Sequence, residues 1–127
     1  MRFLSVYKAK ETNAPPTAAE METMGKLIEE MMKAGTLIAT EGCLPSATGA
    51  RVRVANGKFA VTDGPFTESK ELIAGFALLE AESKEHAVEL TKRFLQVVGE
   101  GECEIRQIFT GADPVHQCAP EADNARR

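Results

Sequence analysis

The chain has 127 residues, of which 43% are hydrophobic and 27% charged, a composition typical of a globular protein of one domain. Its net charge of −4 argues against a general binder of nucleic acid or of an anionic membrane, because such a protein needs a basic face. The longest apolar run, residues 72–79, is far shorter than the roughly 20 residues that span a bilayer. We therefore expect a cytoplasmic protein without direct contact to nucleic acid or membrane.

Metal and cofactor signals are missing from the sequence. The three cysteines, Cys43, Cys103 and Cys118, form no Cys-x-x-Cys pair and indicate reduced thiols rather than a disulfide framework or a zinc site. His86 and His116 lie far apart, and no glycine-rich phosphate loop is present. We expect neither a metal nor a cofactor.

The first part of the chain predicts a strand, a helix and a second strand. Residues 3–7 are apolar on both faces, as in a central strand. Thr17 and Glu20 have the spacing of a capping box, and Gly35 can end the helix that follows. Residues 36–40 predict the second strand. A methionine-rich stripe on the helix is either the face that packs on the sheet or a binding surface: Met21, Met24, Leu27, Ile28, Met31 and Met32.

Residues 51–62 predict a β-hairpin around Asn56-Gly57, because this dipeptide favours a type I′ turn. In the register that the turn sets, one face is apolar and consists of Val52, Val54, Phe59 and Val61. The opposite face is polar and basic and consists of Arg51, Arg53, Lys58 and Thr62. The hairpin therefore has one face to bury. The basic face is either merely solvated or a place to bind an anion or ligand.

The second part predicts a strand, a helix and a last strand. Residues 72–79 form a nearly continuous apolar run, typical of a strand that is buried on both faces. Ser83 is suited to cap a second helix, which Gly99 ends. Residues 103–109 alternate in polarity as a last strand. Residues 110–127 are expected to form an arm or to be disordered.

This order of elements predicts a fold of the α+β class. Strand, helix, strand, hairpin, strand, helix, strand is a ferredoxin-like split βαβ pattern with an inserted β-hairpin. Two helices on one side of the sheet leave its other face without cover. Because the first strand and the strand at residues 72–79 are apolar on both faces, we expect a second subunit to supply that cover in a symmetric homodimer.

Residues 62–71, with the sequence TDGPFTESKE, are the most informative stretch of the chain. Asp63 can form an Asx turn, Gly64-Pro65 imposes a rigid corner, and Phe66 is expected to point inward. A rigid loop on a scaffold is where binding groups tend to lie. On local grounds Asp63 is either a functional carboxylate or only a turn residue, and both alternatives stay open.

The stretch from Asp63 to Glu71 resembles the signature of the DGPF subgroup of YCII-related proteins. Segments at residues 41–48, 51–53, 57–58, 75–76 and 104–106 resemble the flanking parts of that family. The likeness covers residues 1–109, which we expect to form a single domain followed by a tail at residues 110–127. It implies a small bacterial protein with a ferredoxin-like fold, paired as a dimeric α/β barrel. It implies no settled activity.

The resemblance also directs attention to candidate site residues. Asp63 and Glu68 are the candidates for a general acid or base that acts on a small polar molecule. If the two loops converge, the ligand-binding candidates are Ser46, Thr48, Arg51 and Lys70. Broader YCII relatives have a histidine that has been suggested to pair with an aspartate. This chain has no histidine before His86, so that mechanism is not carried over.

A rival interpretation makes the protein a non-enzymatic regulatory module. Proteins with this signature resemble domains that occur beside, or fused to, extracytoplasmic-function sigma factors. A sigma factor is therefore a candidate partner, as an alternative to a small-molecule ligand. Whether the protein is an enzyme stays open at this point.

Overall fold

The computed structural model describes residues 1–12 and 14–111. The tail predicted at residues 110–127 lies almost wholly outside this part of the chain, as do His116 and Cys118. Neither of the two described helices is long and apolar enough to cross a membrane.

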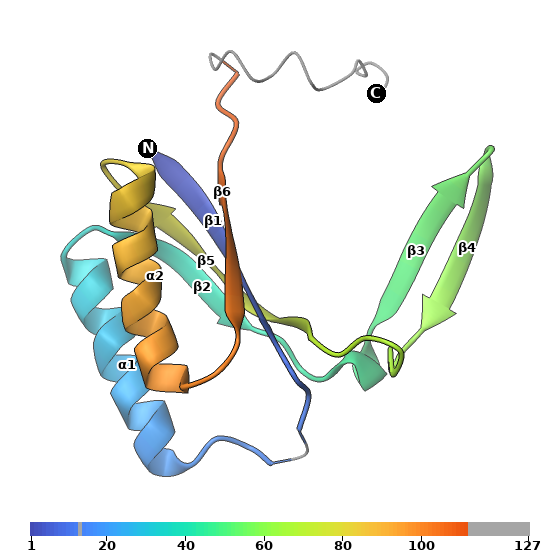
Figure 1. The fold of residues 1–127 in the computed structure, drawn as a ribbon, viewed down its shortest axis with the longest axis horizontal. Coiled ribbons are helices and arrows are strands. Elements are labelled where there is room, and N and C mark those ends of the chain that lie inside the picture. The colour runs from blue at the N-terminus through green and yellow to red at the C-terminus, as the bar shows by residue number, and fades with distance from the viewer. Residues whose placement is uncertain (13, 112–127) are drawn as a thin grey trace.

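A four-stranded antiparallel sheet with the order β2-β5-β1-β6 forms the body of the molecule (Figure 1). Its strands are β1 (Arg2–Ala9), β2 (Leu37–Gly42), β5 (Leu72–Glu80) and β6 (Glu102–Gln107). The helices α1 (Ala18–Lys33) and α2 (Lys84–Val98) lie on one side of the sheet. A separate hairpin of β3 (Ala50–Ala55) and β4 (Lys58–Asp63) projects from the other side. This mixed α+β arrangement is consistent with the predicted ferredoxin-like fold.

Both helices begin where the capping signals predict. Thr17 accepts the backbone N–H of Glu20 at 3.1 Å through its hydroxyl, and the Glu20 carboxylate accepts the backbone N–H of Thr17 at 2.8 Å. The Ser83 hydroxyl accepts the backbone N–H of His86 at 3.0 Å. Nδ1 of His86 in turn accepts the backbone N–H of Glu82 at 3.0 Å, so the imidazole belongs to the start of α2.

The core lies between the helices and the sheet. Met24, Leu27, Ile28 and Met31 of α1 belong to it or pack against it. Met21 and Met32 are exposed, so the prediction that the whole methionine stripe faces the sheet is wrong at its two edges. The buried apolar residues come from the helices, the sheet and the adjoining turns: Phe3, Leu27, Met31, Leu37, Leu79, Ala81, Ala87 and Leu90.

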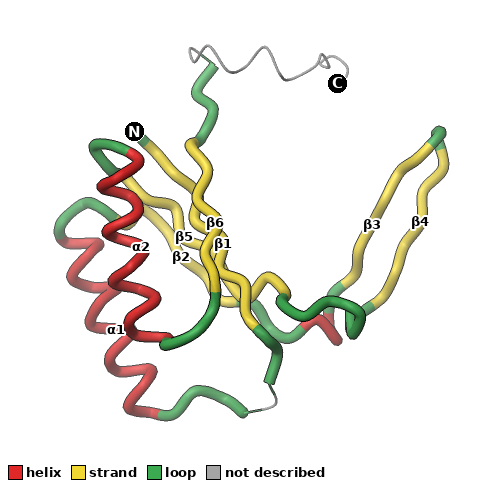
Figure 2. Tube along the Cα trace, viewed as in Figure 1, coloured by secondary structure: helices red, strands yellow, loops and turns green. Residues whose placement is uncertain are grey.

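The two faces of the sheet differ in their cover (Figure 2). Ser5 and Tyr7 of β1 lie beneath the helices, whereas Leu4 and Val6 lie on the opposite face, because side chains alternate along a strand. We call this second face the open face, since no described helix covers it. Its central apolar residues, from β1 and β5, are Leu4, Val6, Ile73, Phe76 and Leu78.

The hairpin has the register that its turn predicts. Val52 pairs with Val61 and Val54 pairs with Phe59, around turn residues Asn56 and Gly57 with φ of 52° and 77°. We call residues 50–63 the hairpin arm. Every residue of its two strands is exposed, including the four apolar residues expected to be buried. The apolar face of the arm therefore exists, but the described part of the chain leaves it uncovered.

Candidate functional site

The two predicted loops converge at the base of the hairpin arm, and Ser46 joins them. Its hydroxyl accepts the backbone N–H of Phe66 at 3.0 Å and donates to the Glu11 carboxylate at 2.9 Å. Its own backbone N–H donates to the other oxygen of that carboxylate at 2.5 Å. The backbone N–H of Gly64 donates to the Gly49 carbonyl at 2.9 Å. These bonds tie both loops to the segment that precedes α1.

Arg51 forms the second half of this loop cluster. Its guanidinium donates to the Glu68 carboxylate and, at 3.2 Å, to the Ser69 hydroxyl. The guanidinium carbon also lies 4.0 Å from the centroid of the Phe66 ring, a cation–π contact. The hydrogen bond from Arg51 is the main cause that lowers the pKa of Glu68. Glu68 is therefore a carboxylate at neutral pH and is already engaged by Arg51.

The other predicted site residues lie apart from this network. Asp63 and Lys70 are exposed, and within the described residues their side chains make no hydrogen bond or ion pair. The Thr48 hydroxyl donates to the Pro45 carbonyl at 3.1 Å, inside its own short turn. Of the six predicted residues, the structure brings three together around Phe66. Ser46 binds its backbone N–H, Arg51 stacks on its ring, and Glu68 binds Arg51.

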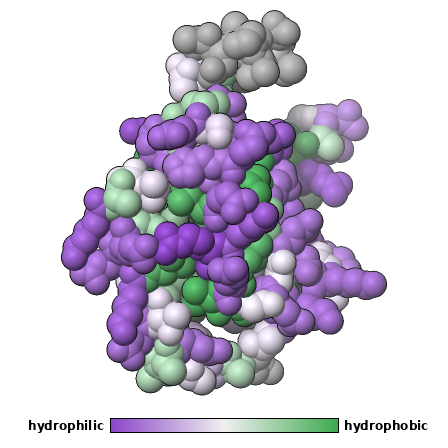
Figure 3. Space-filling model, turned by 60° about the vertical axis from the view of Figure 1, so that its left-hand side comes forward, coloured by the Kyte–Doolittle hydropathy of each residue, from purple (hydrophilic) through white to green (hydrophobic). Residues whose placement is uncertain are grey.

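A cavity of about 440 Å³ lies between the helices and the sheet, and no sequence pattern pointed to it. Hydrophobic surface is visible within a frame of hydrophilic side chains on the face shown in Figure 3. One wall of the cavity is formed by apolar side chains of both helices: Met24, Leu27, Ile28, Met31, Leu90 and Phe94.

Small residues form part of the floor of the cavity. Ser5, Gly42, Gly75 and Ala77 line its floor, and side chains of this size leave a space that protein cores normally fill. Gly75 has no room for a larger residue, because a Cβ there would lie 2.8 Å from the Glu41 carbonyl oxygen of β2. The small floor is thus partly imposed by the close approach of β2 and β5.

A few polar groups interrupt the apolar lining. Thr91 Oγ1 is buried and has no hydrogen-bond partner within the described residues, which is uncommon in folded proteins. Ser5 is buried on the floor, and Cys103 lines the cavity beside it. Burial raises the pKa of the Cys103 thiol, and a hydrogen bond with Ser5 partly opposes that rise. Among the described residues that line the cavity, Glu41 is the only charged one.

Tyr7 also lines the cavity. Its hydroxyl donates to the Glu100 carbonyl at 2.6 Å, and its ring meets Phe94 edge-on, with the centroids 5.0 Å apart. Burial is the main cause that raises the pKa of Tyr7, and the nearby Cys103 and Glu100 add to it. Tyr7 therefore keeps its proton at physiological pH, and its hydrogen bond and ring contact fix the ring in place.

The chemistry of the lining disfavours binding of an anion. The described part of the chain contributes no basic residue to the lining, so a buried anion would find no counter-charge there. Within residues 1–12 and 14–111, no cluster of three or more His, Cys, Asp or Glu side chains could hold a metal ion. What the cavity offers is apolar surface with a few hydroxyl groups, the usual make-up of a small-molecule site.

The described chain is thus a ferredoxin-like α+β protein with an apolar cavity beneath its helices and a tightly bonded loop cluster. It belongs to the family of proteins with a YCII-related domain, because the model of that family matches residues 1–110. An uncharacterised protein of Rhizobium meliloti (strain 1021) is 29% identical to it over 72 residues. That match covers 57% of this chain and 58% of the relative.

The chain can also be superposed on a solved structure, CutA from Xylella fastidiosa. The match covers 92% of this chain and 91% of that one, with 13% sequence identity and a TM-score of 0.39.

Proposed function

We propose that this protein binds an uncharged small molecule with an apolar or aromatic body in the cavity beneath its helices. The observation that supports the proposal is the cavity itself. Its volume of about 440 Å³ lies within the range of roughly 300–1,000 Å³ that is usual for ligand sites. As part of the proposal, the protein belongs to the DGPF subgroup and acts as a homodimer in the cytoplasm.

The polar atoms of the lining define where hydrogen-bonding groups of the ligand belong. Thr91 Oγ1 has no hydrogen-bond partner within residues 1–12 and 14–111, so a hydroxyl or carbonyl group of a ligand that came within hydrogen-bond distance of it would satisfy a buried polar atom. Ser5 offers a second hydroxyl on the floor. A ligand with one or two such groups on an apolar body fits this pattern better than the small polar molecule that was expected from the loops.

The loop cluster is the second candidate site. Asp63 and Glu68 as acid–base residues, with Ser46, Thr48, Arg51 and Lys70 as ligand partners, stay a prediction. The contacts of Ser46 and Arg51 supply a physical reason to rank the cluster second, because their polar groups already have partners in the chain. Association with a sigma factor likewise stays a prediction.

The proposal is tested by titration with N-phenyl-1-naphthylamine, an uncharged probe whose fluorescence rises in apolar surroundings. We expect saturable binding of one probe per chain. Ala77→Leu should weaken it at least about tenfold, because the added side-chain atoms occupy the floor of the cavity. Thr91→Val keeps the shape and removes the hydroxyl, so it should retain the probe, which needs no hydrogen bond there.

Ala39→Leu is the matched control. Ala39 lies on the neighbouring strand β2 opposite Leu78, on the open face, and does not line the cavity. Equal loss of probe binding in Ala39→Leu and Ala77→Leu would place the probe elsewhere and contradict the proposal. Native mass spectrometry of the protein as first purified then identifies any retained compound by its mass.

A further inference from the structure

Two glycines lie side by side on the floor of the cavity. Gly42 of β2 is the register partner of Gly75 of β5, and both line the cavity. Tyr7 of β1 is the next partner in this row and also lines the cavity, so the row faces the helices. The two glycines thus leave a strip of bare backbone, which we call the glycine strip. Gly42 is exposed and belongs to an edge strand, so a ligand can reach the strip from that edge.

The fold does not require a glycine at position 42. Gly42 has no positive φ, and among the described residues an added Cβ would come near only the Ala74 carbonyl oxygen, at 4.0 Å. A glycine weakens a strand, because it loses more conformational freedom on folding and packs no side chain. Close approach of a ligand to the backbone is one of the reasons for which strands contain glycine.

A β-bulge lies directly beside the glycine strip. Tyr7 pairs with Gly75 and Lys8 pairs with Ile73, so Ala74 between them is an extra residue of β5. Ala74 also lines the cavity. Bulges are frequent next to active sites, because they locally change the direction of a strand and of its side chains. The bulge is thus a second feature that marks this end of the cavity as a binding place.

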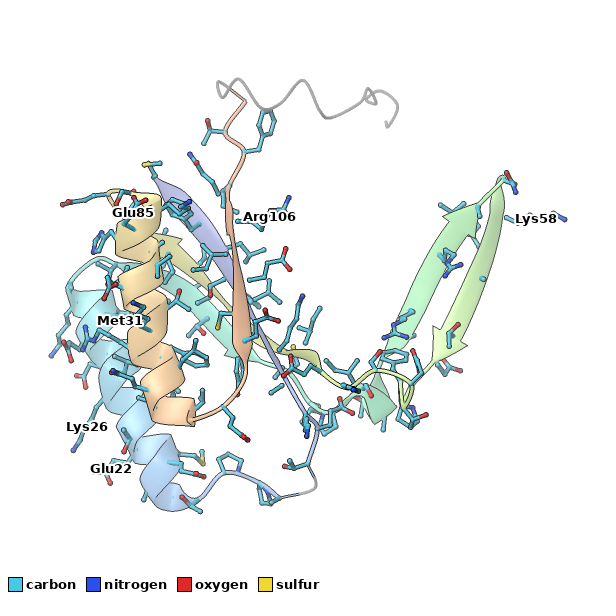
Figure 4. The ribbon with its side chains drawn as sticks, viewed as in Figure 1. Glu22, Lys26, Met31, Lys58, Glu85 and Arg106 are labelled. Atoms are coloured by element: carbon cyan, nitrogen blue, oxygen red, sulfur yellow. The ribbon has the colours of Figure 1, made fainter. Side chains whose placement is uncertain are left out.

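Methionines of α1 contribute to the roof of the cavity. Met24 and Met31 both line it. Glu22 and Lys26, which pair at 3.7 Å, point away from the sheet (Figure 4). Met24 lies two residues from each of them, about 200° around the helix, so its side chain points toward the sheet. The thioether of methionine makes favourable contacts with aromatic rings and adapts its shape to them.

The direction of α1 places Met24 toward the glycine strip. Met31, near the end of α1, belongs to the same buried cluster as Leu37 at the start of β2. Gly42 is the last residue of β2, and Met24 lies about two turns before Met31. Because a short turn joins α1 to β2, the helix and the strand run in opposite directions. Met24 is therefore closer than Met31 to the end of the cavity that contains the strip.

An aromatic pair continues the row of the glycine strip. Tyr7 lies next to Gly75 in the sheet, and its ring meets Phe94 of α2 edge-on, at an interplanar angle of 81°. Both rings line the cavity. Aromatic rings favour edge-on and offset-stacked contacts with further rings. Bare backbone, a methionine and two aromatic rings thus surround one end of the cavity.

We infer that the glycine strip is the subsite for a planar aromatic ring, which lies on the backbone of Gly42 and Gly75 beneath Met24. The inference rests on the proposed function and names the ligand class, a flat fused-ring molecule with a hydroxyl or carbonyl group. The face of a flat ring contacts the bare backbone and the methionine, whereas a saturated ring is thicker and has no π system. Buried apolar area alone would favour neither of the two kinds of ring.

Displacement of N-phenyl-1-naphthylamine tests the ligand class. The competitors are 2-naphthol and decahydro-2-naphthol, which share a carbon skeleton and a hydroxyl group, but only the first is flat. We expect 2-naphthol to bind at least about tenfold more tightly, as one or two favourable ring contacts would give. Equal or tighter binding of decahydro-2-naphthol, with the probe bound in the cavity, would overturn this inference alone. Absence of probe binding in the cavity would overturn the proposed function as well.

Gly42→Val tests the place of the ring. The strand backbone suits valine and a Cβ there has room, so the fold should tolerate the change, while the methyl groups cover the strip. The variant should bind 2-naphthol at least about tenfold more weakly and lose the preference over decahydro-2-naphthol. Gly42→Ala adds a single methyl group and should have an intermediate effect. Circular dichroism checks that each variant folds.

Gly25→Ala is the matched control for these variants. An added Cβ at Gly25 also has free space, but Gly25 lies in α1 and does not line the cavity. The substitution should leave the affinity for 2-naphthol within about twofold, as for a surface residue that contacts no ligand. Unchanged affinity in folded Gly42→Ala and Gly42→Val, or an equal loss in Gly25→Ala, would overturn the assignment of the ring to the glycine strip.

Discussion

The hydroxyl of Ser46 accepts the backbone N–H of Phe66 at 3.0 Å, across 20 positions of sequence. The same side chain is bonded to the Glu11 carboxylate, so one serine joins the segment before α1 to both loops at the base of the hairpin arm. The hydrogen bonds of the loop cluster thus fix the base of the arm and the direction in which the arm leaves the sheet. The loop cluster and the cavity can be tested by separate experiments.

Ser46→Ala should weaken the loop cluster and destabilise the protein. The substitution removes the acceptor for Phe66 and a hydrogen bond with a carboxylate, which together should lower the free energy of unfolding by about 1–3 kcal/mol. Thr48→Ala is the control, because the Thr48 hydroxyl bonds only within its own turn, and should cost less than about 1 kcal/mol. Urea denaturation measures both. A loss for Thr48→Ala as large as that for Ser46→Ala would contradict the role of Ser46.

Gly64 should not tolerate a side chain. A Cβ at Gly64 would overlap the carbonyl oxygen of Ser46, so Gly64→Ala must displace the loop and should destabilise the protein by about 2 kcal/mol or more. Gly49→Ala is a control near the same atom, because its Cβ would lie 3.5 Å from that oxygen, an ordinary contact. Thermal unfolding of both variants checks the difference, and equal melting temperatures would refute it.

The ion pair of Arg51 and Glu68 should make stability depend on pH. Because the folded-state pKa of Glu68 is lowered, its contribution is present above the unfolded-state value of about 4.3 and is lost as the pH falls through the lower folded value. Wild type should therefore be more stable than Glu68→Gln at pH 7, and the difference should shrink below about pH 4.

The pair is exposed, so 0.5 M salt should also reduce this difference. Glu71→Gln is the control, because it removes a nearby exposed carboxylate that has no ion-pair partner within the described residues. A constant difference between wild type and Glu68→Gln from pH 7 to pH 3 would show that Arg51 does not hold Glu68 as a carboxylate.

The cavity should protect Cys103 from alkylation. Its burial and raised pKa leave less thiolate than an ordinary thiol has, whereas Cys43 is exposed. With N-ethylmaleimide at pH 7.5, we expect Cys43 to react at least about ten times faster than Cys103, as resolved by peptide mass mapping. Saturating N-phenyl-1-naphthylamine should slow Cys103 further and leave Cys43 unchanged. A slowing of both would indicate a general change of the fold.

The local signals of the chain predicted its elements well. The capping box of Thr17 and Glu20, the Ser83 cap and the Asn56-Gly57 turn are short-range devices, and each lies where it was expected. The convergence of the loops on Ser46 and Arg51 was not predicted; it was only the condition for a pocket at this place. It was also not predicted that the polar groups of Ser46 and Arg51 already have hydrogen-bond partners within the chain. One of these partners is Glu11, and no pattern in the segment around Glu11 marks it as one.

The cavity and the exposure of the arm could not be predicted from the sequence patterns of single elements. The cavity depends on Ser5, Gly75 and Ala77 lying side by side beneath two helices, which only the sheet register decides. The alternation along β3 and β4 shows that the arm has an apolar face. It contains no information on whether that face is covered by the same chain.

Methyl NMR of the methionines tests the central claim most directly. The chain contains five of them, of which Met24 and Met31 line the cavity and Met1, Met21 and Met32 are exposed. In protein with 13C-labelled methionine methyl groups, N-phenyl-1-naphthylamine should give NOEs to Met24 and Met31 and none to the other three. NOEs to the exposed methionines alone, or to none of the five while the probe is bound, would contradict a ligand site beneath the helices.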